Sequence, residues 1–469
     1  MNFAELQFWK SLALGLVAAW FLALIVGVLK PSLRPLFEKT AFSVISMGLL
    51  FQESPVTLMA FLWVILLGWM CVSSALFSGA NRYRQFFWTA LVVLQLAPLF
   101  YFKYWKFVLE GILGFEVATP HTLIPMGLSF YTFQVISVCL DSKKQGMKPP
   151  RFIDYFNFAS FFPQIVAGPI ERRRDLLPQV EKLRLSVSRL SIEKAIPWIV
   201  LGLFYKMVLA DNLALLSNAL QVNTENGYHI GAEVLLFSLR IYFDFAGYSF
   251  VALGLGALFG ITLTMNFVSP YWSTGLKEFW RRWHVTLSQW LRDYVYFALG
   301  GSKRGILWLN LLLTFIISGI WHGAGWNFLL WGLAHGIGLV ICNLTSKRLR
   351  LPRFLGWCFT LGFVFFTWLF FYETNIQQVG TKTTILLDPR SYLNFSLTSI
   401  TTLFADRAIL ATAGLVVFLS IVSLSLEGLS LRKDRPYSML TSLPVVGLMV
   451  VLLILLTPVE QSTFIYFNF

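Results

Sequence analysis

Charged residues are scarce in this chain: Asp, Glu, Lys and Arg make up 13% of its 469 residues, whereas 57% are hydrophobic. This composition excludes both a soluble globular domain and a disordered segment. Cysteines are also few, and they lie inside apolar stretches without the spacing of a metal or redox motif. We interpret them as packing residues: Cys71, Cys139, Cys342 and Cys358. The chain is therefore predicted to be an integral membrane protein.

The sequence also lacks the motifs of soluble catalysis. It contains no nucleophile elbow, no HExxH pair, no Walker loop and no dinucleotide fingerprint. Nothing in it suggests hydrolysis by a soluble triad or by a metal. We accordingly expect no bound metal and no resident cofactor.

Positive charge exceeds negative charge, with 37 Lys and Arg against 23 Asp and Glu and a formal net charge of +14. The cations form short clusters between apolar stretches, which fits cytoplasmic loops better than a nucleic-acid-binding surface. We expect no nucleic-acid partner. Such loops face an anionic lipid leaflet and would also suit a polyanionic substrate such as coenzyme A. We expect no cleavable signal peptide, because the first apolar run is long enough to span the membrane and no small-residue cleavage site interrupts it.

Apolar stretches long enough to cross a bilayer recur along the chain, since a span needs ~20 mostly apolar residues. These carry no charge: Leu12–Leu29, Val56–Phe77, Phe245–Phe267, Phe354–Tyr372, Ala408–Leu426 and Met439–Val459. Shorter or interrupted ones are expected to tilt or re-enter: Ala41–Phe51, Phe86–Phe102, Leu123–Leu140, Phe156–Ile170 and Ala195–Ala210. Together they predict an all-α integral membrane protein of about 11–13 transmembrane or re-entrant helices. Residues 1–469 are expected to form a single membrane domain.

The segment Ile306–Ser346 contains no charged residue. It has two span-lengths and cations at both ends: Lys303 and Arg304 before it, and Lys347 and Arg348 after it. The positive-inside rule then predicts a helical hairpin with both ends in the cytoplasm. Its far end is expected near Trp321–Asn327, where glycines weaken the helix.

His322 lies in this uncharged segment, and an ionisable group at membrane depth is a functional-site hypothesis by default. The alternative is a neutral imidazole that only bonds across helices. The same alternative applies more strongly to His335. The orientation rule also places Glu373–Arg407 outside the cell and, after the cations near Arg432, the tail 460–469 outside as well.

A second cluster runs from Lys277 to Asp293. On a continuous helix, Arg281, His284, Ser288 and Arg292 would share one face beside tryptophan rings. Such a stripe can hold phosphates through arginine. The alternative is an interfacial anchor helix in which Glu278 pairs with Arg282.

Pro163, Gly168 and Pro169 break the apolar run that precedes Arg172, Arg173 and Arg174. Broken helix at membrane depth is typical of backbone that lines a cavity. The arginines are either topology determinants or ligands for an anion. Asp244, at the edge of an apolar span, is expected to pair with a buried cation or to react.

Several long blocks resemble the membrane-bound O-acyltransferases (MBOAT), most closely the bacterial branch that O-acetylates alginate and other exported polysaccharides. They are SFYTFQ from Ser129, FPQIVAGPIERRRDLLPQ from Phe162, FDFAGYS from Phe243, NFVSPYW from Asn266, EFWRRWHVTLSQWLRDYVYFALGG from Glu278 and GIWHGAGWNFLLWGLAHG from Gly319. The resemblance places the catalytic core at 120–345.

This resemblance implies a cytoplasmic acyl-CoA tunnel that meets an outer funnel near the histidine of the WHG motif, here His322. It assigns the second family histidine to His284. Acetyl-CoA is the implied donor. We expect Arg281, Arg282, Trp283, Arg172 and Arg173 to bind it, with the arginines, including Arg174, near its phosphates. The implied partner is an extracytoplasmic SGNH-hydrolase-like acetyltransferase, and the implied location is the bacterial inner membrane.

The C-terminal tail is similar to the FxYxxF ending of this branch, whose tyrosine, here Tyr466, is thought to carry the acyl group. The alternative is an aromatic anchor at the membrane interface. The resulting hypothesis is an acetyl relay from acetyl-CoA to a polysaccharide, with His322 as general base and a tyrosyl ester on Tyr466.

Other functional classes stay open at this point. A transporter or flippase for a polysaccharide precursor would also need polar groups inside the membrane, although no matching halves with broken helices are visible. Teichoic-acid type D-alanyl transfer and a purely structural membrane scaffold are further alternatives.

Overall fold

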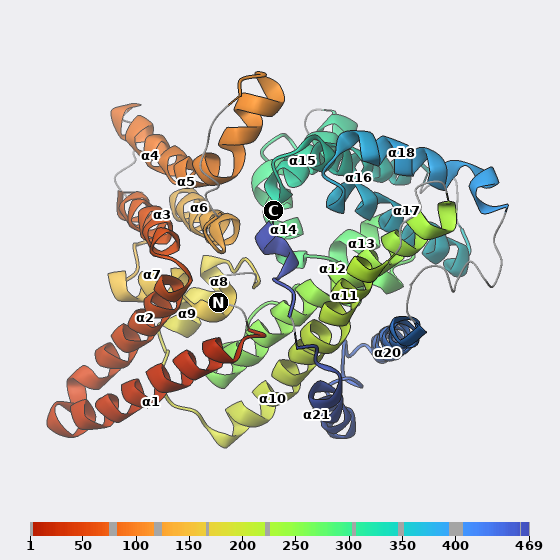
Figure 1. Cartoon of the computed structure of the whole chain (residues 1–469). Helices are drawn as coiled ribbons and strands as arrows, with labels where there is room; N and C mark the ends of the chain where they lie inside the picture. Colours follow the sequence, from red (N-terminus) through yellow and green to blue (C-terminus); the bar gives the residue numbers. More distant parts are fainter. Residues whose placement is uncertain are drawn as a thin grey trace. The chain divides into compact units, whose positions relative to one another are not determined.

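The computed structural model describes residues 3–74, 82–116, 124–165, 168–220, 226–302, 306–345, 351–393, 407–459 and 461–468. Every regular element in these ranges is an α-, 3-10 or π-helix, and none is a strand (Figure 1). The predicted all-α fold is thereby confirmed.

The chain packs as two compact units. The described residues of the first lie within Met1–Ile199, Tyr248–Met265 and Tyr466–Asn468, and those of the second lie within Val200–Gly247 and Asn266–Ile465. The single membrane domain expected for 1–469, the core at 120–345 and the tail 460–469 stay predictions. Within that tail, residues 460 and 469 lie outside the described ranges.

The first unit is built mainly from the N-terminal helices. These are α1 (Leu6–Leu29), α2 (Arg34–Glu53), α3 (Pro55–Ser74), α4 (Arg82–Leu94), α5 (Ala97–Leu99), α6 (Leu128–Gln145), α7 (Phe152–Ala159), α8 (Phe162–Ile165) and α9 (Arg173–Val180). The predicted stretch Phe156–Ile170 is divided between α7 and the single turn of α8, as expected for a segment that Pro163 and Gly168 interrupt.

The second unit contains most of the C-terminal helices. They are η5 (Phe204–Ala210), α11 (Asp211–Ala219), α13 (Leu276–Arg282), α14 (Val285–Leu291), α15 (Leu307–His322), α16 (Trp326–Thr345), α17 (Arg353–Tyr372), α18 (Ile376–Leu387), α20 (Arg407–Arg432) and α21 (Leu443–Leu456). Helices α10 (Arg189–Leu203) and α12 (Gly227–Leu258) each contribute residues to both units.

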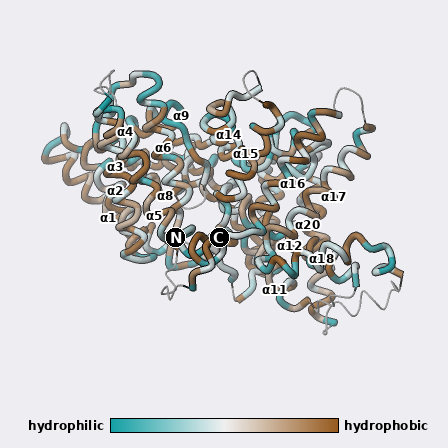
Figure 2. Tube along the Cα trace, turned by 90° about the horizontal axis from the view of Figure 1, so that it is seen from above, coloured by the Kyte–Doolittle hydropathy of each residue, from teal (hydrophilic) through white to brown (hydrophobic). Residues whose placement is uncertain are grey.

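Eight helices in the described ranges are long and apolar enough to cross a membrane, and α15 and α21 are shorter apolar helices. Helices α1, α3, α17 and α20 confirm four of the uncharged spans predicted from the sequence, although residues 75–77 of the second lie outside the described ranges. Figure 2 shows hydrophobic colouring along much of these helices, with hydrophilic residues concentrated towards helix ends and connections. The chain is a multi-pass membrane protein.

The predicted span Phe245–Phe267 is wrong in its bounds. Helix α12 begins at Gly227, eighteen residues earlier, and ends at Leu258, just before Gly260 with its φ of +71°. Glu233 and Asp244 lie inside the helix because each is paired, with Lys382 at 2.9 Å and with Lys206 at 2.8 Å. Apolar length alone therefore underestimated a helix whose charges are neutralised by distant partners.

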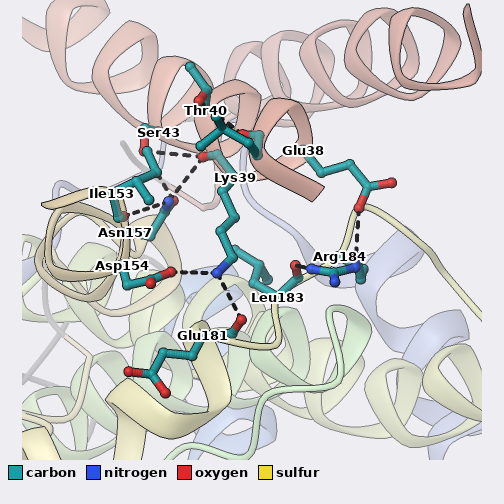
Figure 3. Close-up of polar contacts among 11 residues, drawn as sticks. Glu38, Lys39, Thr40, Ser43, Ile153, Asp154, Asn157, Glu181, Leu183 and Arg184 are labelled. Atoms are coloured by element: carbon teal, nitrogen blue, oxygen red, sulfur yellow. Dashed lines mark hydrogen bonds and ion pairs between the residues drawn. The ribbon is translucent and has the colours of Figure 1, made fainter. Parts of the chain in front are cut away.

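Helix α2 shows the same effect in the first unit. Lys39 is 7% exposed, and its Nζ lies 2.5 Å from Asp154 Oδ1 of α7 and 2.8 Å from Glu181 O, just after α9 (Figure 3). Asn157 Nδ2 donates to Lys39 O at 3.0 Å. A lysine that would interrupt a span in isolation thus joins three helices in the fold.

Helices α15 and α16 form the hairpin that the uncharged segment predicts. Their backbones approach closely at glycines: a Cβ on Gly319 would lie 2.2 Å from Phe328 O, and one on Gly332 would lie 2.4 Å from Phe315 O. The turn falls at 323–325, within the predicted range. The cations that oriented the hairpin, at 303, 304, 347 and 348, lie outside the described residues.

Candidate active site

His322 is the last residue of α15, at the tip of the hairpin. Its side chain is buried, and its ring centroid lies 4.9 Å from that of Trp321, 4.9 Å from that of Trp331 and 5.1 Å from that of Phe371. These rings come from α15, α16 and α17. Helix packing therefore places the predicted catalytic imidazole in an aromatic box, where the rings restrict its rotation.

His284 lies between α13 and α14 with a left-handed φ of +44°. Its Nδ1 is 3.2 Å from Asn266 Oδ1, which also accepts from Thr286 N at 3.2 Å and from Thr286 Oγ1 at 2.9 Å. Since the Thr286 N–H identifies this Asn266 atom as the acceptor oxygen, the imidazole hydrogen belongs on Nδ1. His284 then presents Nε2 as an acceptor.

The two predicted histidines meet at one indole. Trp321 lies 4.9 Å from His322 and 5.7 Å from His284, centroid to centroid. Residues 38 positions apart in the sequence are thus brought together within the second unit. Two imidazoles that contact one ring are suited to binding and proton transfer at one site.

His335 forms a further layer on α16. Its ring lies 4.7 Å from that of Trp331, and its Nε2 is 3.0 Å from Thr367 Oγ1. The threonine hydroxyl donates to Val364 O, so it accepts from His335 Nε2–H. This buried and bonded imidazole fits the packing role that the sequence left open for it.

The predicted cationic stripe is interrupted. The helix ends at Arg282 and a new one begins at Val285, because His284 adopts the left-handed conformation. Arg281, Ser288 and Arg292 still share a surface, whereas His284 turns into the core and is 0% exposed. The expectation that His284 shares their face is therefore wrong, and the backbone turn is the physical reason.

A pocket of ≈ 540 Å³ lies along this surface within the second unit. Three cations line it, Lys277, Arg281 and Arg292, together with Trp280 and Ser318. The volume is in the range of small-ligand sites. Ser318 is one helical turn before His322, so the pocket follows α15 towards the imidazole, although His322 does not belong to its lining.

Arg282 and Trp283 occupy other positions. Arg282 Nη2 pairs with Glu278 Oε1 at 2.6 Å, which confirms the pairing considered for an anchor helix. Trp283 is fully buried, 4.9 Å from the ring of Trp368 and 5.6 Å from that of Phe279. The structure thus brings Arg281 to the pocket but not its two neighbours.

Arg172 and Arg173 belong to the first unit and are both buried. Arg173 donates to Ser142 Oγ and to Lys148 O, each at 2.5 Å, so its guanidinium joins α9 to the end of α6. Glu171 accepts from Thr264 N at 2.6 Å and from Thr264 Oγ1 at 3.1 Å. The two hydrogen bonds of Arg173 therefore stabilise the packing of α9 against the end of α6 within the first unit.

A buried carboxylate supports the segment that carries Asn266. Glu427 of α20 accepts from Tyr205 at 2.6 Å and from Tyr242 at 2.8 Å. The hydroxyl of Tyr437 lies 3.2 Å from that of Tyr242 and accepts from Ser269 N at 2.8 Å. The network therefore fixes Ser269, three residues from the asparagine that orients His284.

Sequence reasoning missed Asn266, Trp321 and Glu427. The first two stand inside blocks that the sequence shares with a known family, and their polar or aromatic character in an apolar stretch was a usable signal. Glu427 follows a long apolar run, where it looked like the end of a span. Its role becomes visible only when its tyrosine partners are placed.

Tyr466 is 9% exposed and belongs to the first unit, whereas Ser462, Phe464 and Ile465 belong to the second. Phe464 lies 5.8 Å from Phe245, whose ring is 4.8 Å from that of His284. Phe464, two residues before the predicted acyl carrier, thus contacts the same phenylalanine ring as His284.

Several known proteins are similar to this chain in sequence. A peptidoglycan O-acetyltransferase from Helicobacter pylori is 35% identical over 64% of this chain and 64% of its own length. The "Probable alginate O-acetylase AlgI" of Pseudomonas putida is 36% identical over 62% of each chain. A teichoic acid D-alanyltransferase from Streptococcus thermophilus is 31% identical over 48% of this chain and 58% of its own. The chain spans less than two thirds of the length of these relatives.

The model of the membrane-bound O-acyltransferase family matches residues 50–379, which include both histidines, Asn266 and the whole α15–α16 hairpin. The match covers well over half of the chain and all residues of the site in the second unit apart from Glu427, Tyr437 and the tail. By this match, the chain belongs to the membrane-bound O-acyltransferase (MBOAT) family.

Proposed function

We propose that this chain is an O-acyltransferase that passes an acetyl group from acetyl-CoA across the bacterial inner membrane for O-acetylation of an exported or cell-wall polysaccharide. The observation that supports it best is the pairing of His322 and His284 around Trp321. The relatives named for peptidoglycan and alginate O-acetylation support the acetyl group and the class of acceptor.

The acetyl group first moves to a nucleophile on the chain. His322 removes the phenolic proton of Tyr466, and the phenolate oxygen attacks the thioester carbonyl carbon. The C–S bond breaks, and the leaving thiolate takes the proton from the imidazolium, so that coenzyme A departs as a thiol. Burial raises the pKa of the Tyr466 phenol well above its usual value, which is why attack requires a base.

The remaining residues bind and orient. Lys277, Arg281 and Arg292, which line their pocket, offer charge-assisted contacts to the phosphates of the donor. His284, with its hydrogen on Nδ1 towards Asn266, accepts a hydrogen bond at Nε2 and relays the proton or positions the thioester. Arg282, Trp283 and Arg173 act on the donor only through the packing that they stabilise, and Arg172 is a further cation for its phosphates.

The tyrosyl ester then faces an extracytoplasmic SGNH-like acetyltransferase partner, which moves the acetyl group to a sugar hydroxyl. D-alanyl transfer is the second candidate, favoured by the relatives named as teichoic acid D-alanyltransferases. The two differ in the mass added to Tyr466, which makes them separable in one measurement.

The test is the fate of labelled acetyl-CoA in membranes that contain the full chain. Mass spectrometry of the C-terminal peptide is expected to find acetyl-Tyr466 in the unsubstituted protein and none in Tyr466→Phe. His322→Ala is expected to lower the rate of labelling at least ~10²-fold, since a general base contributes that much. The matched control is His229→Ala, which removes another buried imidazole, in the first turn of α12.

Full labelling of His322→Ala at equal protein abundance would remove the base from the proposal. Labelling by a D-alanyl donor but not by acetyl-CoA would replace the acetyl group with D-alanine. Substrate uptake without consumption of acetyl-CoA would favour a transporter instead.

A further inference from the structure

A charged cluster in the second unit joins two candidate membrane spans, Arg189–Ala219 and Gly227–Leu258. Lys206, within the π-helix η5, has its Nζ 2.7 Å from Asp211 Oδ1 and 2.8 Å from Asp244 Oδ1. Their side chains are 2%, 0% and 1% exposed. Ionised groups at this depth are costly, and π-helical turns are frequent at functional sites. The cluster therefore calls for an explanation beyond helix packing.

The same three side chains reach the C-terminal tail. Lys206 Nζ donates to Ser462 O at 2.8 Å, and Ser462 Oγ donates to Asp211 Oδ1 at 2.6 Å. The backbone N–H of Ile465 donates to Asp244 Oδ2 at 2.6 Å. The ammonium group thus donates to Asp211 Oδ1 and to the tail, at Ser462 O and Ser462 Oγ, and it forms an ion pair with Asp244.

The net charge of the cluster explains why hydrogen bonds from the C-terminal tail stabilise it. One lysine against two aspartates leaves a net charge of −1 in a buried site. A buried charge is tolerated only when hydrogen bonds compensate it, and the Ser462 hydroxyl and the Ile465 N–H supply two such bonds to the carboxylates. Since two of the four hydrogen bonds between the cluster and the tail use backbone atoms of the tail, the cluster recognises the peptide backbone as well as the Ser462 side chain.

Packing around the cluster supports the same conclusion. A Cβ on Gly247 would lie 2.7 Å from Gly202 O, so glycine allows α12 to approach η5 and brings Asp244 to Lys206. Asn212 Nδ2 donates to Leu456 O at 2.9 Å, at the end of α21. Phe464 is fully buried against Phe245. The chain is therefore held on both sides of Ser462.

We propose that Lys206, Asp211 and Asp244 form a clasp that binds the chain's own segment Ser462–Ile465 and thereby positions Tyr466. The next Cα along the chain is only ~3.8 Å from the last clasped residue, so the clasp restricts where the phenol can go. The inference rests on the proposed function in so far as Tyr466 carries the acyl group. The three charged side chains are positioning residues and do not touch the reacting atoms.

The experiment measures exposure of the tail in the full chain. Ile465→Cys keeps the backbone N–H that the clasp binds, and Cys342→Ser with Cys358→Ser removes the two cysteines that are not buried. The probe is a charged, water-soluble maleimide. In the clasp variant, Lys206→Met, Asp211→Leu and Asp244→Leu remove all three charges together, which avoids an unpaired buried ion.

A second lysine with two carboxylates provides the matched control. Lys382 Nζ lies 2.9 Å from Glu233 Oε1 and 2.9 Å from Glu373 Oε2, and it joins α18 to α12 and to the end of α17. The control variant carries Lys382→Met, Glu233→Met and Glu373→Met. Ser462→Ala is the milder clasp variant, because it removes only the hydroxyl contacts and leaves the ion cluster in place.

The labelling rate of the introduced thiol at position 465 is expected to rise about tenfold or more in the clasp variant and by a smaller factor in Ser462→Ala. It is expected to stay unchanged in the control variant, because local opening becomes less costly only where the clasp is removed. Equal labelling of clasp and control variants would overturn the clasp. If the triple variant does not fold, unchanged labelling in Ser462→Ala overturns it instead. A different result would contradict the proposed function: acetyl transfer that continues in Tyr466→Phe while the clasp is intact.

Discussion

Gly319→Ala tests whether the hairpin geometry controls the reaction centre. A Cβ at this position would lie 2.2 Å from Phe328 O, whereas ordinary contact begins near 3.4 Å. The obstacle is a backbone oxygen, which cannot rotate away. Helices α15 and α16 must therefore separate by about 1.2 Å, the difference between these two distances.

The separation has two costs. Overpacking of this kind lowers the free energy of unfolding by ~1–3 kcal/mol. His322 follows Gly319 by three residues in the same last turn, so its imidazole moves with the backbone. A misplacement of about 1 Å near the reacting groups lowers the rate ~10²-fold. We expect the activity loss to exceed what the loss of stability explains.

The measurement combines thermal unfolding of detergent-solubilised protein with acetyl transfer to Tyr466 in membranes. The matched control is Gly362→Ala in α17, where a Cβ meets nothing within 4 Å. There, alanine stabilises the helix by up to ~1 kcal/mol and leaves transfer unchanged. If Gly319→Ala is as stable and as active as Gly362→Ala, the close approach of the two helices does not position the imidazole.

Two further predictions concern buried carboxylates. Glu427→Leu leaves the hydroxyls of Tyr205 and Tyr242 without their acceptor and is expected to lower unfolding stability by ~2–5 kcal/mol, seen as a lower Tm; an unchanged Tm contradicts the network. Burial raises the pKa of Glu171 to about 7, although hydrogen bonds from Thr264 lower it. The folded state thus holds the proton more tightly than the unfolded state. The protonated Glu171 side chain contributes about 3 kcal/mol to the free energy of unfolding. This contribution is complete below pH ~4.5 and is lost as the pH rises through about 7. Glu171→Gln should flatten that part of a Tm–pH series, and parallel curves for the two proteins would refute the assignment.

Much of the fold was predictable because long apolar stretches have few alternatives in a bilayer. Spans such as α1, α17 and α20 followed from apolar length, and the α15–α16 hairpin followed from an uncharged segment with a glycine-rich middle. His322 was identifiable as a candidate from its rarity in apolar surroundings, His284 from the charged cluster Lys277–Asp293, and both from shared sequence blocks. Their meeting at Trp321 was not, because spacing along the chain says nothing about which helices pack together.

Other predictions required distant partners. Helix α12 begins earlier than predicted because Lys206 and Lys382 neutralise two acidic residues within it. A search for uncharged apolar stretches excludes such residues. The arginine stripe was interrupted because His284 adopts a left-handed backbone conformation, stabilised by Asn266 eighteen residues earlier. Neither the pairing nor the turn has a local signature in the residues themselves.

By itself, the sequence determined that this protein is a helical membrane protein and where its uncharged hairpin turns, and it singled out His322 as an imidazole in apolar surroundings. These features depend on local composition and on the cost of placing polar groups in lipid. Only the tertiary structure decided that the histidines share one indole, that Glu427 supports the segment beside them and that Lys206 reaches Ser462. Such contacts join residues as much as 256 positions apart, and their energy depends on a geometry that packing alone creates.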